Sequence, residues 1–219
     1  MENEIYSDLS QKNLKNQRTN QAVAAAAELF MKNGIEEVKM TDIADASNVG
    51  VATLYRYFGT KPRIVTEVMT YLWDNINELF SGVFDSHEFL SQTGIKQLSD
   101  LMRMFHVLYS AHGDFMRLVA EFDRYSIREQ IPKEELREYE QSVINFNPVV
   151  ERAYRHGLED GTVREVEDFG LFFLSYSHAL LELCKKFVGG EVLPSDDFSH
   201  ADMELQMLID TAIHYLENK

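Results

Sequence analysis

Apolar residues recur along most of this chain at the three- and four-residue spacing that is typical of amphipathic α-helices. The first clear run contains Val23, Ala27 and Phe30, and Asn33-Gly34 ends it with residues suited to a left-handed helix terminus. The chain of 219 residues has only four Pro and 11 Gly, which suits helices throughout. The sequence therefore predicts an all-α fold.

After residue 60 the same spacing predicts a long helix and five further helices. The long helix reaches about Phe84 and has one apolar side, formed by Ile64, Val68, Tyr71, Leu72, Ile76 and Leu79. The further helices are expected at about Ile95–Ala111, Asp114–Arg128, Pro132–Glu159, Glu167–Val188 and His200–Glu217. Breaks that contain Gly separate most of them, and the longest break, Gly189–Ser199, also contains Pro194.

The stretch TDIADASNVGVATLYRYFGTK, from Thr41 to Lys61, predicts two short helices joined by a tight turn. The helices are expected around Thr41–Ala46 and Val51–Tyr57. Asn48 tolerates the left-handed conformation that such a turn needs, and a small residue in the first helix lets the two helices cross closely. This spacing of small, turn and apolar positions is that of a DNA-binding helix-turn-helix. Its inward-facing residues are Ile43, Ala44, Val49, Leu54 and Phe58.

The outward face of the second short helix carries small, aromatic and basic side chains. Small residues let a backbone approach a base edge, Arg can reach guanine, and Tyr hydroxyls can reach phosphates. Lys61 stands at the start of the next helix, where free backbone N–H groups also favour a phosphate. An ordinary helical hairpin inside a bundle is the alternative, but its surface would more often carry Glu and Lys. The predicted DNA-contacting residues are Lys39, Thr41, Val51, Ala52, Thr53, Tyr55, Arg56, Tyr57 and Lys61.

Residues Thr19–Ile64, which include AAAELFMKNG and IADASNVGVATLYRYFGTK, resemble the N-terminal DNA-binding domain of the TetR/AcrR family of transcriptional regulators. The run TLYRYF followed by a lysine is the specific part of this likeness. The sequence departs from the family's usual residues at Lys39, Asn48, Gly50 and Ala52. The resemblance implies a three-helix helix-turn-helix head and a larger helical body that binds an effector and dimerises.

The head is expected at residues 1–60, with residues 1–18 as a flexible tail, and the body at residues 61–219. Residues 1–63 carry eight basic and eight acidic side chains, so the net charge of −15 arises wholly from residues 64–219. An acidic body would repel DNA and leave only the neutral head to dock. This repulsion would favour one orientation of the protein on the DNA. The alternative is that the acidic helices are simply solvated, and the two interpretations do not exclude each other.

Nothing in the sequence has the arrangement of a catalytic, metal or nucleotide site. The seven His residues include no pair at helical i, i+4 spacing with the Glu of a zinc helix, and there is no Cys-x-x-Cys. A nucleophile elbow, a phosphate loop and a dinucleotide fingerprint are likewise missing from the sequence. We therefore expect no enzymatic activity, no bound metal and no cofactor.

Cysteine usage and hydropathy favour a cytoplasmic protein. The single Cys184 cannot form an internal disulfide, as expected in a reducing compartment. Its apolar sequence neighbours favour a buried structural thiol, whereas a redox sensor would need an accessible thiolate. No apolar run approaches the ~20 residues of a membrane span, and the polar segment Met1–Ser10 is not that of a signal peptide.

Aromatic residues are frequent in the predicted body and fall on different helices that could converge. Tyr hydroxyls need partners when they are buried, and a closed core more often uses Leu and Ile. A mostly apolar pocket with a few polar anchors is typical of a small-molecule site, although an ordinary aromatic core remains the alternative for each residue. The resemblance implies that this region holds the effector pocket. The candidate pocket residues are Trp73, Phe105, Tyr109, Phe122, Tyr125, Tyr139, Phe146 and Tyr176.

The predicted helix near Phe169–Val188 is apolar around most of its circumference, so it needs neighbours on several sides. The last helix offers one neighbour, and a two-fold copy of the pair would close a four-helix bundle. The resemblance also implies that the last two helices form the dimer interface. The candidate interface residues are Phe173, Leu180, Leu181, Cys184, Leu205, Leu208, Ala212 and Leu216.

The sequence thus predicts a regulator, expected to act as a repressor, that binds a palindromic operator in double-stranded DNA as a homodimer. A small apolar or amphipathic effector would release it, and cationic compounds are favoured if the acidic body extends into the pocket. One alternative is a helix-turn-helix regulator controlled by a protein partner without a small ligand. Another is a helical enzyme or carrier with an N-terminal hairpin. The sequence leaves open the effector, the operator, the regulated genes and whether binding represses or activates.

Overall fold

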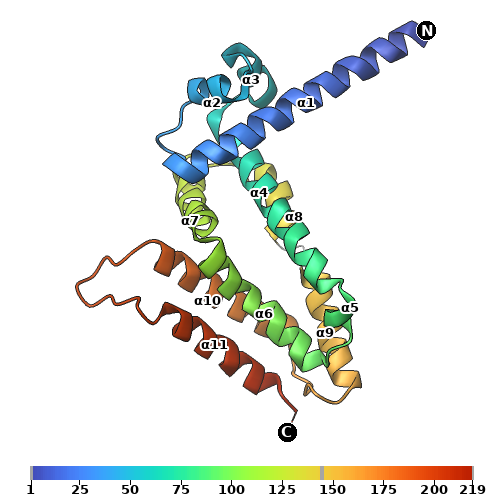
Figure 1. Cartoon of the computed structure of the whole chain (residues 1–219), viewed down its shortest axis with the longest axis vertical. Helices are drawn as coiled ribbons and strands as arrows, with labels where there is room; N and C mark the ends of the chain where they lie inside the picture. Colours follow the sequence, from blue (N-terminus) through green and yellow to red (C-terminus); the bar gives the residue numbers. More distant parts are fainter. Residues whose placement is uncertain (1, 144–145, 219) are drawn as a thin grey trace. The chain divides into compact units, whose positions relative to one another are not determined.

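The computed structural model describes residues 2–143 and 146–218. Within these ranges the chain forms α-helices and one 3-10 helix but no strand, which confirms the predicted all-α fold (Figure 1). The elements are α1 (Glu2–Asn33), α2 (Met40–Ser47), α3 (Val51–Phe58), α4 (Lys61–Phe84), α5 (His87–Leu90), α6 (Gly94–Ala111), α7 (Gly113–Arg128), the 3-10 helix η1 (Lys133–Leu136), α8 (Arg137–Val143), α9 (Asn147–Glu159), α10 (Phe169–Val188) and α11 (Ala201–Leu216).

The helices form two compact units. The first unit comprises Met1–Asp74 and Glu121–Ser142, and the second comprises Asn75–Ala120 and Val143–Lys219. The expected division at residue 60 followed a break in the helical pattern. The boundaries between the compact units instead fall within helices, in α4 after Asp74 and in α7 after Ala120, so α4 and α7 each contribute to both units.

Three helical segments differ from the sequence-based expectation. Residues 2–18, expected as a flexible tail, continue α1, which contains neither Gly nor Pro to interrupt it. The single helix expected at Pro132–Glu159 is divided into η1, α8 and α9, and Pro148 lies in the first turn of α9, where a missing N–H is tolerated. The short α5 was not predicted; the Ser86 hydroxyl caps it by accepting from the N–H of Phe89 at 3.2 Å.

In the first unit, α1 packs against both α2 and α3, and these two helices also pack against each other (Figure 1). Small side chains on α1 allow this close approach, since Ala22 and Ala26 are fully buried. Phe30 and Ile43 fill the space beneath, and both are almost completely buried. The unit therefore buries the apolar stripe of α1 that the sequence predicted.

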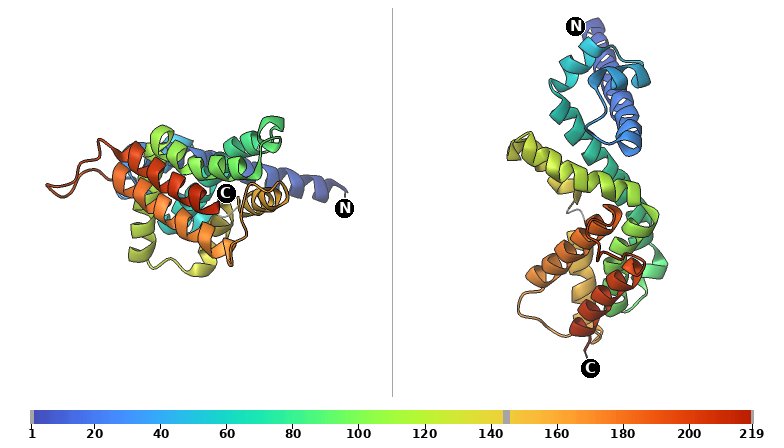
Figure 2. Two further views of the ribbon diagram at one scale, coloured as in Figure 1. Left: turned by 90° about the horizontal axis from the view of Figure 1, so that it is seen from below. Right: turned by 90° about the vertical axis from the view of Figure 1, so that its left-hand side faces the viewer.

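In the second unit, α6 is the central helix and packs against α9, α10 and α11 (Figures 1 and 2). Its buried residues recur on several sides, including Leu98, Leu101 and Leu108. The first turn of α6 is capped from the end of α9: the Asp160 carboxylate accepts from the N–H of Gly94 at 2.8 Å. These contacts fix the start of α6 against α9, which satisfies a backbone donor that a helix start leaves free.

Candidate functional site

The α2–turn–α3 segment has the geometry that the sequence predicted. Asn48 follows α2 in the left-handed conformation, with φ 54° and ψ 33°, and the Val49 N–H donates to the Ala44 carbonyl at 3.2 Å. The residues predicted to face inward, Ile43, Ala44, Val49, Leu54 and Phe58, are all buried. Tight turn geometry and this buried set confirm a helix-turn-helix.

Short-range hydrogen bonds hold both ends of α2. The Asp42 carboxylate accepts from the Lys39 N–H at 2.8 Å, which satisfies a free donor at the start of the helix. At the other end, the Ser47 hydroxyl donates to the Ile43 carbonyl at 2.6 Å. Gly59 ends α3 with φ 73°, a conformation that favours glycine. Local hydrogen bonds and backbone conformation therefore fix where α2 and α3 begin and end.

The nine predicted DNA-contacting residues all lie at the surface of the first unit. Lys39, Thr41, Ala52, Tyr55 and Arg56 are exposed, and Tyr55 retains half of its accessible surface. The remaining four are half-buried: Val51, Thr53, Tyr57 and Lys61. The surface defined by these nine residues is called the α3 face below.

Two guanidinium groups meet at the Tyr57 hydroxyl on the α3 face. Arg56 lies over the Tyr57 ring at 5.2 Å from its centroid. Hydrogen bonds from Arg56 and then from Arg18 lower the pKa of Tyr57. Arg18 comes from α1 and was not among the predicted contacts, although the sequence cluster of Lys12, Lys15 and Arg18 was a signal for it. The α3 face is thus more basic than the recognition helix alone.

Lys61 has a partner within its own chain. Its ammonium donates to the Glu36 carbonyl at 3.1 Å. Burial, the largest cause, lowers the pKa of Lys61, and the nearby charges of Glu36 and Arg128 act in opposite directions. Since an ammonium has three donors, this bond leaves others for a further acceptor such as a phosphate.

Residues 22–68 match the sequence profile of bacterial regulatory proteins of the tetR family. The matched segment runs from α1 through the helix-turn-helix into α4. A TetR transcription regulator from Haloarcula marismortui has a similar fold, with a TM-score of 0.66 and 14% identity over 92% of this chain and 99% of that chain. The whole helix-turn-helix lies within the matched segment, so this chain carries the DNA-binding segment of the tetR family. It is a DNA-binding transcriptional regulator.

Two further solved structures share the regulator's fold. The transcriptional regulator FadR from Bacillus subtilis, in complex with stearoyl-CoA, has a TM-score of 0.63 and 16% identity over 88% of this chain and 96% of that chain. A protein assigned as a transcriptional regulator from Saccharomonospora viridis, in complex with choline, has a TM-score of 0.68 and 14% identity over 93% and 100%. Among curated protein sequences, none matches the regulator.

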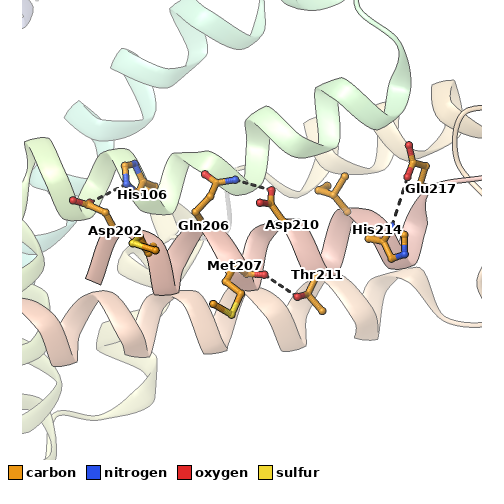
Figure 3. A pocket seen from close by; sticks show the side chains of 10 residues that line it. His106, Asp202, Gln206, Met207, Asp210, Thr211, His214 and Glu217 are labelled. Carbon is orange, nitrogen blue, oxygen red and sulfur yellow. Dashed lines mark hydrogen bonds and ion pairs between the residues drawn. The ribbon is translucent and has the colours of Figure 1, made fainter. Parts of the chain in front are cut away.

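The regulator's second unit opens a groove of about 950 Å³ along α11 (Figure 3). At one end, His106 Nε2 of α6 lies 2.9 Å from a carboxylate oxygen of Asp202. The lining residues are His106, Asp202, Met203, Gln206, Met207, Asp210, Thr211, Ile213, His214 and Glu217. Among these described lining residues there is none of the eight aromatic pocket candidates.

Four of the eight aromatic candidates belong to the first unit, where three of them are in contact. The Trp73 indole N–H donates to the Tyr139 hydroxyl at 3.4 Å. The centroids of the Phe122 and Tyr139 rings lie 4.8 Å apart. Burial raises the pKa of Tyr139 and raises that of the fourth candidate, Tyr125, to about 12. Trp73, Phe122 and Tyr139 are called the tryptophan cluster below.

The other four candidates lie in the second unit and make separate contacts. Phe146 packs its ring edge against Phe80 and Phe84, in an apolar core. Tyr109 meets Phe187 at 5.7 Å, and Tyr176 meets Phe172 at 4.8 Å. Phe105 is almost completely buried on α6. These contacts are those of core side chains and do not join the four residues into one group.

Of the eight candidate interface residues, five are buried within their own unit. Leu180, Cys184, Leu205, Ala212 and Leu216 have no accessible surface. They face α6 and the α10–α11 contact, so they cannot present surface to a second chain. Phe173, Leu181 and Leu208 are half-buried. The exposed apolar side chains on these helices are different ones: Leu171, Leu174, Met203, Met207 and Tyr215.

The Cys184 thiol is enclosed by its own unit. It donates to the Phe105 carbonyl at 3.3 Å and is fully buried. Burial raises its pKa from 9.0 to about 12, so a reactive thiolate is disfavoured.

The described residues meet the requirements of neither a metal site nor a membrane span. Residues 2–143 and 146–218 contain no group of three His, Cys, Asp or Glu side chains placed to hold an ion. Among the helices of these ranges, none has the length and apolar character needed to cross a membrane.

Proposed function

We propose that this regulator is a cytoplasmic repressor that binds a palindromic operator as a homodimer and is released by a small apolar or amphipathic effector. The observation that carries the dimer is the unpaired apolar surface of α10 and α11. Leu171 and Met207 each leave more than 60% of their surface accessible, and three further large apolar side chains on these helices leave about half or more. Large exposed apolar side chains on two helices that pack together favour an interaction surface.

The spacing of these residues favours a helical partner. Leu171 and Leu174 lie on one side of α10, and Met203 and Met207 lie on one side of α11, at the three- and four-residue intervals that align side chains along a helix. A second copy related by a two-fold axis would pair this surface with itself and close a four-helix bundle. Two symmetric heads would then require an operator with two inverted half-sites.

For DNA contact, the α3 face supports the assignment made from the sequence. Arg56 is exposed and would read guanine or bind a nearby phosphate, while Thr53, Tyr55, Tyr57 and Lys61 would position the head on the backbone. Arg18 joins this set because it shares the Tyr57 hydroxyl with Arg56. With Lys39, the set holds four cationic groups, which favour phosphate contacts even though the whole chain is acidic.

For the effector, we propose the tryptophan cluster as part of the binding site. A buried tyrosine hydroxyl and an indole N–H supply the polar anchors that an apolar site uses to orient a ligand. Asp74 and Asp123 lie on α4 and α7, the helices that carry Trp73 and Phe122 of this cluster, and their charges favour a cationic amphiphile over an anionic one. Two proteins of similar fold hold choline and stearoyl-CoA, so the fold accommodates both kinds of ligand.

Trp73 is the only tryptophan of the chain, so its fluorescence reports on this site alone. We expect saturable quenching or a spectral shift on titration with dodecyltrimethylammonium, a weaker response with dodecanoate, and release of bound DNA in parallel. A Tyr139→Phe variant, which lacks the hydroxyl that contacts the indole, should change the apparent affinity. A response only to carboxylates would overturn the proposed charge preference, and no response to either would remove the cluster from the effector site.

Selection of bound sequences from a random DNA pool tests the operator proposal. We expect enriched sequences with two inverted half-sites, and two chains per duplex when the complex is weighed by light scattering. Enrichment of a single, asymmetric half-site bound by one chain would show that the regulator does not act as a symmetric dimer.

A further inference from the structure

Glu36, in the turn between α1 and α2, has each of its polar groups held by another helix of the first unit. Its N–H and that of Ile35 donate to one carboxylate oxygen of Glu121, at 3.2 and 2.7 Å. Its carbonyl accepts from the Lys61 ammonium at 3.1 Å. Its carboxylate forms an ion pair with Arg128. Glu121 and Arg128 lie on α7 and Lys61 opens α4, so the turn between α1 and α2 is joined to two further helices.

The backbone before this turn is adapted to the Glu121 carboxylate. Gly34 has φ +81°, a conformation that side chains rarely adopt. A Cβ at this position would lie only 3.1 Å from the second oxygen of Glu121. The carboxylate therefore sits directly over the glycine while its other oxygen receives two N–H groups. Hydrogen bonds to a charged acceptor are stronger than neutral ones, so Glu121 fixes the conformation of this turn.

We propose that Glu121 is a positioning residue for DNA binding. By fixing the Glu36 backbone it holds the carbonyl that orients Lys61, whose remaining two N–H donors are then directed to a phosphate. Glu121 lies outside the segment that matches the family profile and does not belong to the α3 face. The inference rests on the proposed contact between Lys61 and DNA, and it adds a residue of α7 to the determinants of DNA affinity.

The sign of the effect separates this role from general electrostatics. A Glu121→Gln variant loses one negative charge, so simple repulsion predicts tighter DNA binding. The positioning role predicts weaker binding, by about three- to tenfold at low salt, and a salt slope lowered by about 0.9, as for the loss of one phosphate contact. The measurement is the affinity of the full-length regulator for a mixed-sequence DNA duplex across a range of salt concentrations.

Two matched variants complete the test. Asp114→Asn removes a charge from an exposed ion pair at the other end of α7 and is expected to leave affinity unchanged or slightly raised. Glu36→Gln removes the partly exposed partner of Arg128 without touching the core, so it retains the fold should Glu121→Gln fail to do so. It is expected to weaken binding in the same direction as Glu121→Gln.

A Lys61→Ala background distinguishes the two levels of the proposal. Glu121→Gln should cost nothing further there, because both changes remove the same contact. Weaker binding by Lys61→Ala with an unchanged or tighter Glu121→Gln variant would overturn the positioning role and leave the Lys61 contact intact. An unaltered Lys61→Ala variant would instead overturn the contact and the positioning role together.

Discussion

Gly94 and Gly157 bring the backbones of α6 and α9 into direct contact. A Cβ at Gly94 would lie 2.1 Å from the nitrogen and 2.2 Å from the Cα of Gly157. Gly157 is confined on another side as well, since a Cβ there would lie 2.3 Å from a methyl group of Val163, which follows α9. Because backbone atoms cannot move aside as a flexible side chain can, the absence of a side chain at Gly94 sets the distance between the two helices.

Gly94→Ala is therefore expected to destabilise the regulator by about 1–3 kcal/mol, through overpacking at the α6–α9 contact. The thermal midpoint should fall on the order of 5 °C. The same substitution at Gly82 of α4, where a Cβ meets nothing within 4 Å, should stabilise by about 0.5–1 kcal/mol, because alanine favours a helix more than glycine does. Thermal melts of both variants followed by circular dichroism check the pair, and equal shifts would contradict the close contact.

Arg56→Ala is expected to weaken binding to the selected operator by about 1–3 kcal/mol, if the guanidinium contacts guanine through two hydrogen bonds. The preference for guanine at one position of each half-site should be lost at the same time. Arg117→Ala removes the same charge from an exposed surface of α7 and should have little effect. Repeating the random-pool selection with both variants measures the change, and an unaltered preference would assign Arg56 to the phosphate backbone.

Lys61→Ala should weaken binding to all DNA sequences alike and lower the salt slope by about one. The expected cause is the loss of one phosphate contact at the start of α4. Affinities for operator and mixed-sequence duplexes, each measured over a range of salt concentrations, test this expectation. A loss confined to the operator would point to base recognition by Lys61 instead.

Met207→Asp should convert the proposed dimer to a monomer. The substitution places a charge on the exposed apolar surface of α11, where a partner would have to bury it without a counter-ion. Val83→Asp introduces the same charge at an exposed position of α4 and should leave the mass unchanged. Light scattering at micromolar concentration compares the three proteins. A variant that stays dimeric, or a wild type that is monomeric, would place the interface elsewhere or remove it.

The buried Cys184 thiol is expected to make the regulator less stable at alkaline pH. Its pKa in the folded chain, about 12, lies above its ordinary value of 9.0. The stability that depends on the neutral thiol is therefore fully present below about pH 9 and is lost as the pH rises toward 12. Between pH 8 and pH 10 this loss is about 1.4 kcal/mol. Urea unfolding at both pH values should show a decline larger by that amount in the wild type than in Cys184→Ala, and equal declines would contradict it.

Local chemistry was sufficient to predict the helix-turn-helix. The turn at Asn48 depends on the intrinsic tolerance of one residue for a left-handed backbone, and Leu54 and Phe58 are buried because helical periodicity places them on one side. The exposure of Arg56 follows from the same periodicity. For these positions a few neighbouring residues contain the information, so the sequence alone determined the element, its turn and its outward surface.

Contacts between distant segments decided the rest. α10 is apolar on most sides, so periodicity could not tell that Leu180 faces its own core while Leu174 faces outward. Glu121 reads as a surface carboxylate until α7 is packed beside the α1–α2 turn, 85 residues away in the sequence. In the same way, Gly94 and Gly157 acquire their role only where α6 crosses α9. Each depends on which segments meet, and packing, not local propensity, determines that.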